Sequence, residues 1–256
     1  MVRGRLNPSL AKGRCPEKGR KGAFDNVISE LSSLANPEKV IIFHQFFQAF
    51  PGGYGEGDQF AGIKVPHLRH VAKQFYSTLS FDETEQLLRH PIHEYRLTAL
   101  FILTYQYEKG SPSDKEKVVE IYLRNTAIIN NWDLVDASAH KILGHYYFDK
   151  DRALFYQLAA SKDLWEQRIS IISTFCFIRQ HQYEDSLNIA KILLVHPHDL
   201  IHKAVGWMLR EVGNRDYDTE YQFLEEHYHN MPRTMLRYAI EKFSEPVRQQ
   251  FLKGKI

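Results

Sequence analysis

The segment NNWDLVD at residues 130–136 places an aromatic ring and a carboxylate where both can act on one ligand. On a helix, Trp132 and Asp136 lie one turn apart and share a face, whereas Asp133 is rotated about 100° away from Trp132. An aromatic ring attracts a cation to its face, and a neighbouring carboxylate neutralises the charge. The segment is therefore a candidate cation-binding site. Spacing alone favours the structural alternative, in which Trp132 packs in the core and an aspartate near the helix N-terminus stabilises the helix dipole.

Two further residues extend this candidate site if the fold brings them to the same surface. Trp207, in KAVGWMLRE, lies toward the edge of an apolar helix face, so the sequence leaves its exposure open. Arg168 begins an otherwise apolar helix in LWEQRISII. If Arg168 lies at the surface, it caps the helix or pairs with a carboxylate. If it faces a groove, it contacts phosphate or keeps Asp136 ionised through its positive charge. Trp165, three residues earlier, is interpreted as core packing.

Other motifs predict no additional chemistry. The GGYGEG stretch at 52–57 has no preceding strand and no following GK[ST], so it is interpreted as a flexible loop. The histidines grouped at 196–202 form no HExxH motif, so we expect capping or surface roles and no metal site. The cysteines, Cys15 and Cys176, form no CxxC pair. Cys176 lies in the apolar run SIISTFCFI and is expected to be a buried thiol, not a nucleophile.

The elements that position these residues are predicted to be helices from residue 23 onward. In 199–213, for example, apolar residues recur at spacings of three and four, which places them on one helix face. Alternating β-branched runs and Asn-Gly turns are missing, so no strands are expected. The expected helices form successive pairs: 25–35 with 37–50, 66–77 with 81–89, 92–107 with 113–124, 131–147 with 151–160, 164–180 with 184–194, 199–212 with 217–228, and 231–243 with 245–252.

A weak repeat accompanies these pairs. Basic residues near helix starts, Arg96, Arg168, Lys203 and Arg237, follow one another at intervals of 72, 35 and 34 residues. The helix at 132–136 fills the position missing from the longest interval. Two helices per unit and a period in the mid-thirties are typical of HEAT or armadillo repeats. We therefore predict an all-α solenoid of paired antiparallel helices, with ligand binding on the concave surface.

Composition and charge limit the class of protein. The 256 residues are 43% hydrophobic and 25% charged, which is typical of globular proteins, and the mean hydropathy of −0.42 together with the lack of a long apolar run predicts a soluble, intracellular protein. Residues 1–22 carry a net +6, and subtracting this from the formal +2 of the chain leaves −4 for the rest. The sequence thus predicts a basic disordered tail at 1–22 and a single domain at 23–256. A nucleic acid would have to bind this domain through a local patch.

Taken together, NNWDLVD, LWEQRISIISTFCFIR, HKAVGWMLREVG and MPRTMLRYAIEKF resemble the AlkD-like family of DNA alkylation repair glycosylases. The loop YGEGDQFAGIKVPHLR also resembles that family, and the resemblance covers residues 24–252. It implies a right-handed superhelix of HEAT-like repeats with a positively charged concave groove for duplex DNA. It also implies excision of cationic N3- and N7-alkylated purines, such as 3-methyladenine and 7-methylguanine, by a monofunctional enzyme that needs no metal or other cofactor and does not flip the base into a pocket.

Carried over by motif, the resemblance implies roles for individual residues. Asp136 would be the catalytic carboxylate, Trp132 and Trp207 the groove-facing tryptophans, and Arg168 the catalytic-site arginine. The resemblance further implies action on double-stranded DNA in a bacterial-type cytoplasm, at the nucleoid, and it assigns no role to residues 1–22. A monomer is expected, because a solenoid groove that wraps DNA needs no partner subunit. Contacts to the DNA backbone would come from Lys64, Arg69, Lys203, Arg210, Thr234 and Arg237.

The residues also fit this chemistry on physical grounds. Alkylation at purine N3 or N7 makes the base cationic and weakens its glycosidic bond, so no strong general acid is needed. A fixed carboxylate such as Asp136 would stabilise the oxocarbenium-like sugar and orient water. Two alternatives stay open. HEAT-like solenoids are frequently protein-binding scaffolds, and a non-catalytic DNA-structure binder would keep the basic contacts without releasing base.

Overall fold

The computed structural model describes residues 22–256, and the predicted all-α class is confirmed. Within this range the only β-pairing is an isolated bridge between Gln59 and Ile92. The predicted tail at 1–22 lies outside the described residues except for Gly22, which precedes the first helix. The helices are α1 (Ala23–Ser33), α2 (Pro37–Phe46), α3 (Val65–Phe75), α4 (Phe81–Leu88), α5 (His93–Lys109), α6 (Pro112–Arg124), α7 (Trp132–Ala139), α8 (Ala153–Ala159), α9 (Leu164–Ser173), α10 (Phe175–Ile178), α11 (Glu184–Ile192), α12 (Asp199–Gly213), α13 (Tyr217–His227), α14 (Arg233–Ala239) and α15 (Glu245–Lys253), with short turns η1 (Thr126–Ile128), η2 (His140–Gly144), η3 (Tyr228–Asn230) and η4 (Ile240–Lys242).

Side chains that satisfy free backbone amides set several helix starts. Ser80 accepts a hydrogen bond from the amide of Glu83, whose carboxylate accepts one from the Ser80 amide in return. Ser111 and Asp114 form the same capping box at the start of α6. Such caps pair the amides that have no partner within the helix and stabilise it by about 1 kcal/mol.

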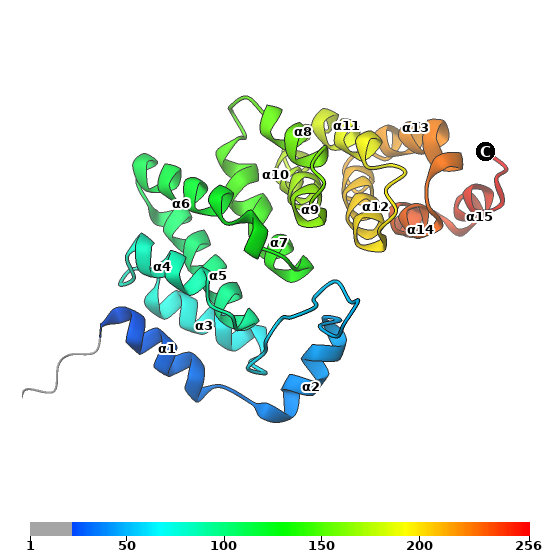
Figure 1. Ribbon diagram of the computed structural model, residues 1–256. Helices are drawn as coiled ribbons and strands as arrows, with labels where there is room; N and C mark the ends of the chain where they lie inside the picture. The colour runs from blue at the N-terminus through cyan, green and yellow to red at the C-terminus, as the bar shows by residue number, and fades with distance from the viewer. Residues whose placement is uncertain (1–21) are drawn as a thin grey trace, which may run out of the picture.

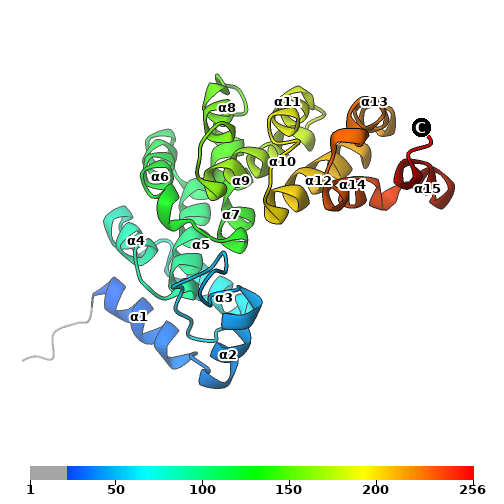
Figure 2. The same ribbon diagram turned by 45° about the vertical axis from the view of Figure 1, so that its right-hand side comes forward.

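Successive pairs stack into one curved row. Helices α3, α5, α7, α9, α12 and α14 each pack on the next and form an inner layer, while α4, α6, α8, α11 and α13 cover them on the outside (Figures 1 and 2). One buried core runs between the layers, with Leu100, Ile169 and Val205 fully inaccessible to solvent. The inner helices therefore present their free faces along one side of the row, as the repeat pattern predicts.

The first predicted pair is wrong. Helix α1 packs on α3, whereas α2 buries none of its residues and does not pack on α1 as a hairpin partner. The reason lies in the run VIIFHQFFQAF, whose apolar side chains surround α2 and define no single stripe for a neighbouring helix to cover. Ile41 and Ile42 consequently remain 69% and 60% exposed.

Two helices that the sequence predicts as continuous are interrupted. The helix predicted at 131–147 changes from α7 to a π-helical turn at η2, and the helix predicted at 164–180 divides into α9 and α10. At the other end of the row, Gly206 allows α12 and α14 to approach closely. A Cβ atom at Gly206 would lie 2.5 Å from the carbonyl oxygen of Met235. Among the described helices none is long and apolar enough to cross a membrane.

Candidate active site

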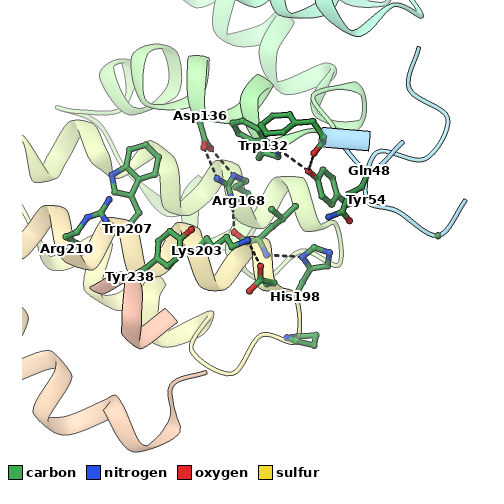
Figure 3. Close-up of a pocket in the computed structure, with 15 residues that line it drawn as sticks. Gln48, Tyr54, Trp132, Asp136, Arg168, His198, Lys203, Trp207, Arg210 and Tyr238 are labelled. Carbon is green, nitrogen blue, oxygen red and sulfur yellow. Dashed lines mark hydrogen bonds and ion pairs between the residues drawn. The ribbon is translucent and has the colours of Figure 1, made fainter. Parts of the chain in front are cut away.

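A cleft of about 820 Å³ opens on the free side of the inner layer (Figure 3). Side chains from α7, α9 and α12 form one part of its lining, and the end of α2 and the loop that follows it form another. The four residues that the sequence singles out, Trp132, Asp136, Arg168 and Trp207, all line this cleft. The fold thus brings together residues that are up to 75 positions apart in the chain.

The start of α7 orients the first two of these residues. The buried Asn131 caps the helix by accepting a hydrogen bond from the Trp132 amide through its side chain. One turn then separates Trp132 from Asp136, and both line the cleft as the spacing predicts. Asp133 points elsewhere, and its carboxylate accepts a hydrogen bond from His93.

Asp136 and Arg168 form a two-point ion pair inside the cleft. The guanidinium donates from Nε and Nη2 to the two carboxylate oxygens at 2.9 and 2.7 Å. A third bond, from Nη1 to the carbonyl oxygen of Leu200, anchors the arginine to the start of α12. Burial raises the pKa of Asp136 above its ordinary value, and the charge and hydrogen bonds of Arg168 oppose that rise. Because both carboxylate oxygens accept from cationic N–H groups, this geometry favours the ionised form.

Residues at the end of α2 and in the loop that follows it, called the α2 loop, contact Trp132 and fix its position. Its indole stacks on Phe47 with a centroid separation of 5.6 Å and meets Phe46 edge-on at 5.8 Å. The indole N–H donates to the Tyr54 hydroxyl at 3.2 Å, and that hydroxyl donates to the carbonyl oxygen of Phe46 at the same distance. Burial raises the pKa of Tyr54, so its hydroxyl stays protonated and available as a donor. The glycine-rich stretch at 52–57, interpreted from the sequence as a flexible loop, therefore carries a residue of the site, Tyr54.

A buried ionic network lies behind Trp132. His93 donates to Asp58 at 3.0 Å and to Asp133 at 2.9 Å, and Arg96 pairs with the other oxygen of Asp58 at 2.6 Å. Burial lowers the pKa of His93, but the charges and hydrogen bonds of Asp133 and Asp58 together outweigh it and raise the pKa to about 9. His93 is thus a cation at neutral pH, and it ties the α2 loop to the N-termini of α5 and α7.

The opposite wall of the cleft comes from α12. The Trp207 indole N–H donates to Glu211 at 3.1 Å, and its ring lies 5.9 Å from that of Phe175. Lys203 pairs with Asp199 at 2.6 Å, and Arg210 pairs with Glu241. The predicted capping role is confirmed for His198, which accepts a hydrogen bond from the amide of Leu200 and thereby caps α12.

The residues predicted to contact the DNA backbone do not all lie at the cleft. Of the implied DNA contacts, Lys203 and Arg210 line the cleft, and Thr234 lies beside Asp199, which also lines it. Lys64, Arg69 and Arg237 are exposed and do not line the cleft. Trp165 is buried, which confirms its packing role.

Cys176 departs from its prediction. Its side chain is half-buried and lines a different cavity, because helix α10, which carries it, is a short segment after the break in α9. Sequence reasoning also missed Gln48, Tyr54 and Tyr238, which line the cleft with the predicted residues. Gln48 lies in the aromatic segment that follows α2, and Tyr54 lies in the glycine-rich segment after it, so these unusual compositions were the signal that could have identified them. No comparable signal in the sequence marks Tyr238.

Comparisons with known proteins agree with this architecture. The family model described as DNA alkylation repair enzyme matches residues 27–243. A solved structure described as a predicted DNA alkylation repair enzyme from Enterococcus faecalis superposes with a TM-score of 0.66 at 16% identity, covering 82% of this chain and 97% of that one. AlkD2 from Streptococcus mutans superposes with a TM-score of 0.54 at 13% identity, covering 81% and 98%. A search of curated proteins finds no significant match.

Proposed function

The chain belongs to the DNA alkylation repair enzyme family, and from that premise we propose that it is a monofunctional DNA glycosylase. Its substrate would be double-stranded DNA that carries cationic N3- or N7-alkylated purines. The observation that carries the proposal is the Asp136 carboxylate, which Arg168 fixes at two points in a cleft that Trp132 and Trp207 also line.

Base excision needs a carboxylate to stabilise the sugar cation, whereas the alkylated base is already positively charged and needs no general acid to leave. When the N-glycosidic bond breaks, its electron pair leaves with the base, which becomes neutral, and the positive charge moves to the sugar. Asp136 would stabilise this oxocarbenium-like charge and orient the water whose oxygen bonds to C1′. The water's proton is then released to the carboxylate and on to solvent.

The two tryptophans would flank the deoxyribose of the lesion. Their ring faces attract the developing sugar cation and exclude bulk water from it. Trp132 is already rigid because Phe47 stacks on it and Tyr54 accepts its N–H, so little ordering would be needed on binding. Lys203 and Arg210 would contact phosphates beside the lesion, which requires them to exchange Asp199 and Glu241 for phosphate oxygens.

Quantifying free base tests the proposal. N-methylated duplex DNA is incubated with the wild-type protein and with Asp136→Asn, and released 7-methylguanine and 3-methyladenine are measured. Release by the wild type and a large loss in the variant would support the glycosylase. Salt-sensitive DNA binding without release would instead favour the DNA-structure binder. The absence of both would favour a protein-binding scaffold.

A further inference from the structure

A second cavity, of about 410 Å³, lies where the end of α5 and the start of α6 meet η2 and α10. Three cationic side chains line it, namely Lys115, Lys141 and Arg179, together with the carboxylate of Glu108. Within residues 22–256, none of the three cations forms an ion pair with a carboxylate closer than 4.0 Å. The cations in the cleft differ, since Arg168, Lys203 and Arg210 each have a carboxylate partner.

This concentration of positive charge costs free energy in the free protein. Lys141 is half-buried, and burial, followed by the nearby charge of Arg69, lowers the pKa of its ammonium group against the opposing charge of Glu108. Lys141 and Arg179 also act on the same neighbour, His140, whose pKa burial and these two charges lower to about 4. An anion placed in this cavity would interact favourably with the charges that line it and would replace hydration that Lys141 loses on burial.

The π-helical turn η2 shapes one wall of the cavity. In an α-helix, residues five apart point about 140° away from each other, but the wider π turn reduces that angle. His140 and His145 therefore both face the cavity. The Nδ1 atom of His140 is buried without a hydrogen-bond partner among the described residues, and Tyr107 fixes His145 through a 3.0 Å hydrogen bond.

The two cavities are neighbours. The Phe175 ring lies 5.9 Å from Trp207, which lines the cleft, and 5.4 Å from His140, which lines the second cavity. The guanidinium of Arg179 lies 5.9 Å from the same ring. Phe175 is thus the side chain that separates Trp207 in the cleft from His140 and Arg179 in the second cavity.

We propose that the second cavity is a phosphate subsite, where Lys141 and Arg179, with Lys115, bind a backbone phosphate of the duplex whose lesion occupies the cleft. The identity of the ligand as DNA rests on the proposed function. That the cavity binds an anion rests on a separate observation, namely that its three cations have no carboxylate ion-pair partner among the described residues. Phosphate oxygens are strong acceptors for such cations. None of the DNA contacts that the family resemblance implies is among these three residues.

Salt dependence of DNA binding is the first test, and it uses unmodified duplex so that base release plays no part. Each phosphate contact steepens the slope of log K against log salt by about 0.9. The double variant Lys141→Gln/Arg179→Gln is expected to reduce the slope by about 1. The matched control, Lys191→Gln/Lys253→Gln, removes the same charge from exposed positions outside both cavities and should leave the slope unchanged. Equal slopes for the two double variants would overturn the proposal.

The thiol of Cys176 reports on the cavity directly, because its side chain lines it. In a Cys15→Ser background, the rate of maleimide labelling is measured with duplex DNA and, separately, with inorganic phosphate at the same phosphate concentration. Slowing by DNA but not by inorganic phosphate is the expected result. Slowing by inorganic phosphate alone, or no slowing at all, would overturn the assignment to a backbone phosphate.

These readouts separate the two proposals. If the wild type releases no base, but the salt slope and the Cys176 labelling change as expected, the phosphate subsite stands without the glycosylase. If the wild type releases base, but Lys141→Gln/Arg179→Gln leaves the salt slope unchanged, only the subsite proposal fails.

Discussion

The buried network around His93 makes protein stability depend on pH in a way that can be measured. An unperturbed histidine titrates near pH 6.5, whereas the pKa of His93 is raised to about 9 by Asp133 and Asp58 against the effect of burial. A raised pKa stabilises the folded state fully below the unfolded-state pKa, and the contribution is lost as pH rises through the folded-state value. The difference of about 2.5 pKa units corresponds to roughly 3 kcal/mol, lost mainly between about pH 6.5 and 9.

The perturbation to test is His93→Gln, which removes the titrating group. We expect the wild type to lose about 3 kcal/mol more than this variant between pH 6 and 10, when both are unfolded by urea across that range. At pH 6 the variant should itself be less stable by about 3 kcal/mol or more, because Asp133 loses its charged partner.

The exposed His67 provides the control, and His67→Gln should follow the wild-type profile. The reasoning would be refuted by a wild-type profile parallel to that of His93→Gln between pH 6.5 and 9. Such a result would mean that His93 is neutral in the folded protein, with Asp58 and Asp133 stabilised by other groups.

Three further results are expected. Tyr54→Phe removes the acceptor of the Trp132 indole N–H, so base release should fall roughly 5-fold, equivalent to about 1 kcal/mol, while the salt slope of DNA binding stays unchanged; an unaltered rate would count against a positioning role. Gly206→Ala should destabilise the protein by about 1–3 kcal/mol, measured as a lower urea midpoint, since its Cβ would meet the Met235 carbonyl, and equal midpoints would contradict that contact. Because expulsion of the base depends on the positive charge of the alkylpurine, a duplex carrying a neutral deaminated base should release it far more slowly, and comparable rates would contradict the mechanism.

The sequence predicts the fold well because the signals are local. The apolar spacing of 199–213 identifies α12 within a residue at each end, and the repeat interval places α7, α9, α12 and α14 in equivalent positions. The break at η2 escapes prediction because it depends on tertiary contact. A Cβ at Gly144 would lie 2.4 Å from the carbonyl oxygen of Ser173 on a neighbouring helix, and no local pattern encodes that approach.

The site is predicted only in part, for a related reason. Trp132 and Asp136 share one helix, so their spacing alone places them on one face. Arg168 and Trp207 join them because successive repeats align, and here the family resemblance adds what spacing leaves open. Tyr54 and Gln48 lie on a loop whose path is set by its ends, through Asp58 and the buried network, and loop residues carry no periodicity from which their direction follows.

The most direct test of the central claim is the rate of base release from N-methylated duplex DNA by the wild type and by Asp136→Asn at matched occupancy of DNA. The asparagine keeps the size of the side chain but removes the charge that would face the sugar cation. A loss of about 3 kcal/mol of transition-state stabilisation predicts a rate about 100-fold lower, with the salt slope of DNA binding retained. Equal rates for the two proteins would contradict the assignment of Asp136 as the catalytic carboxylate.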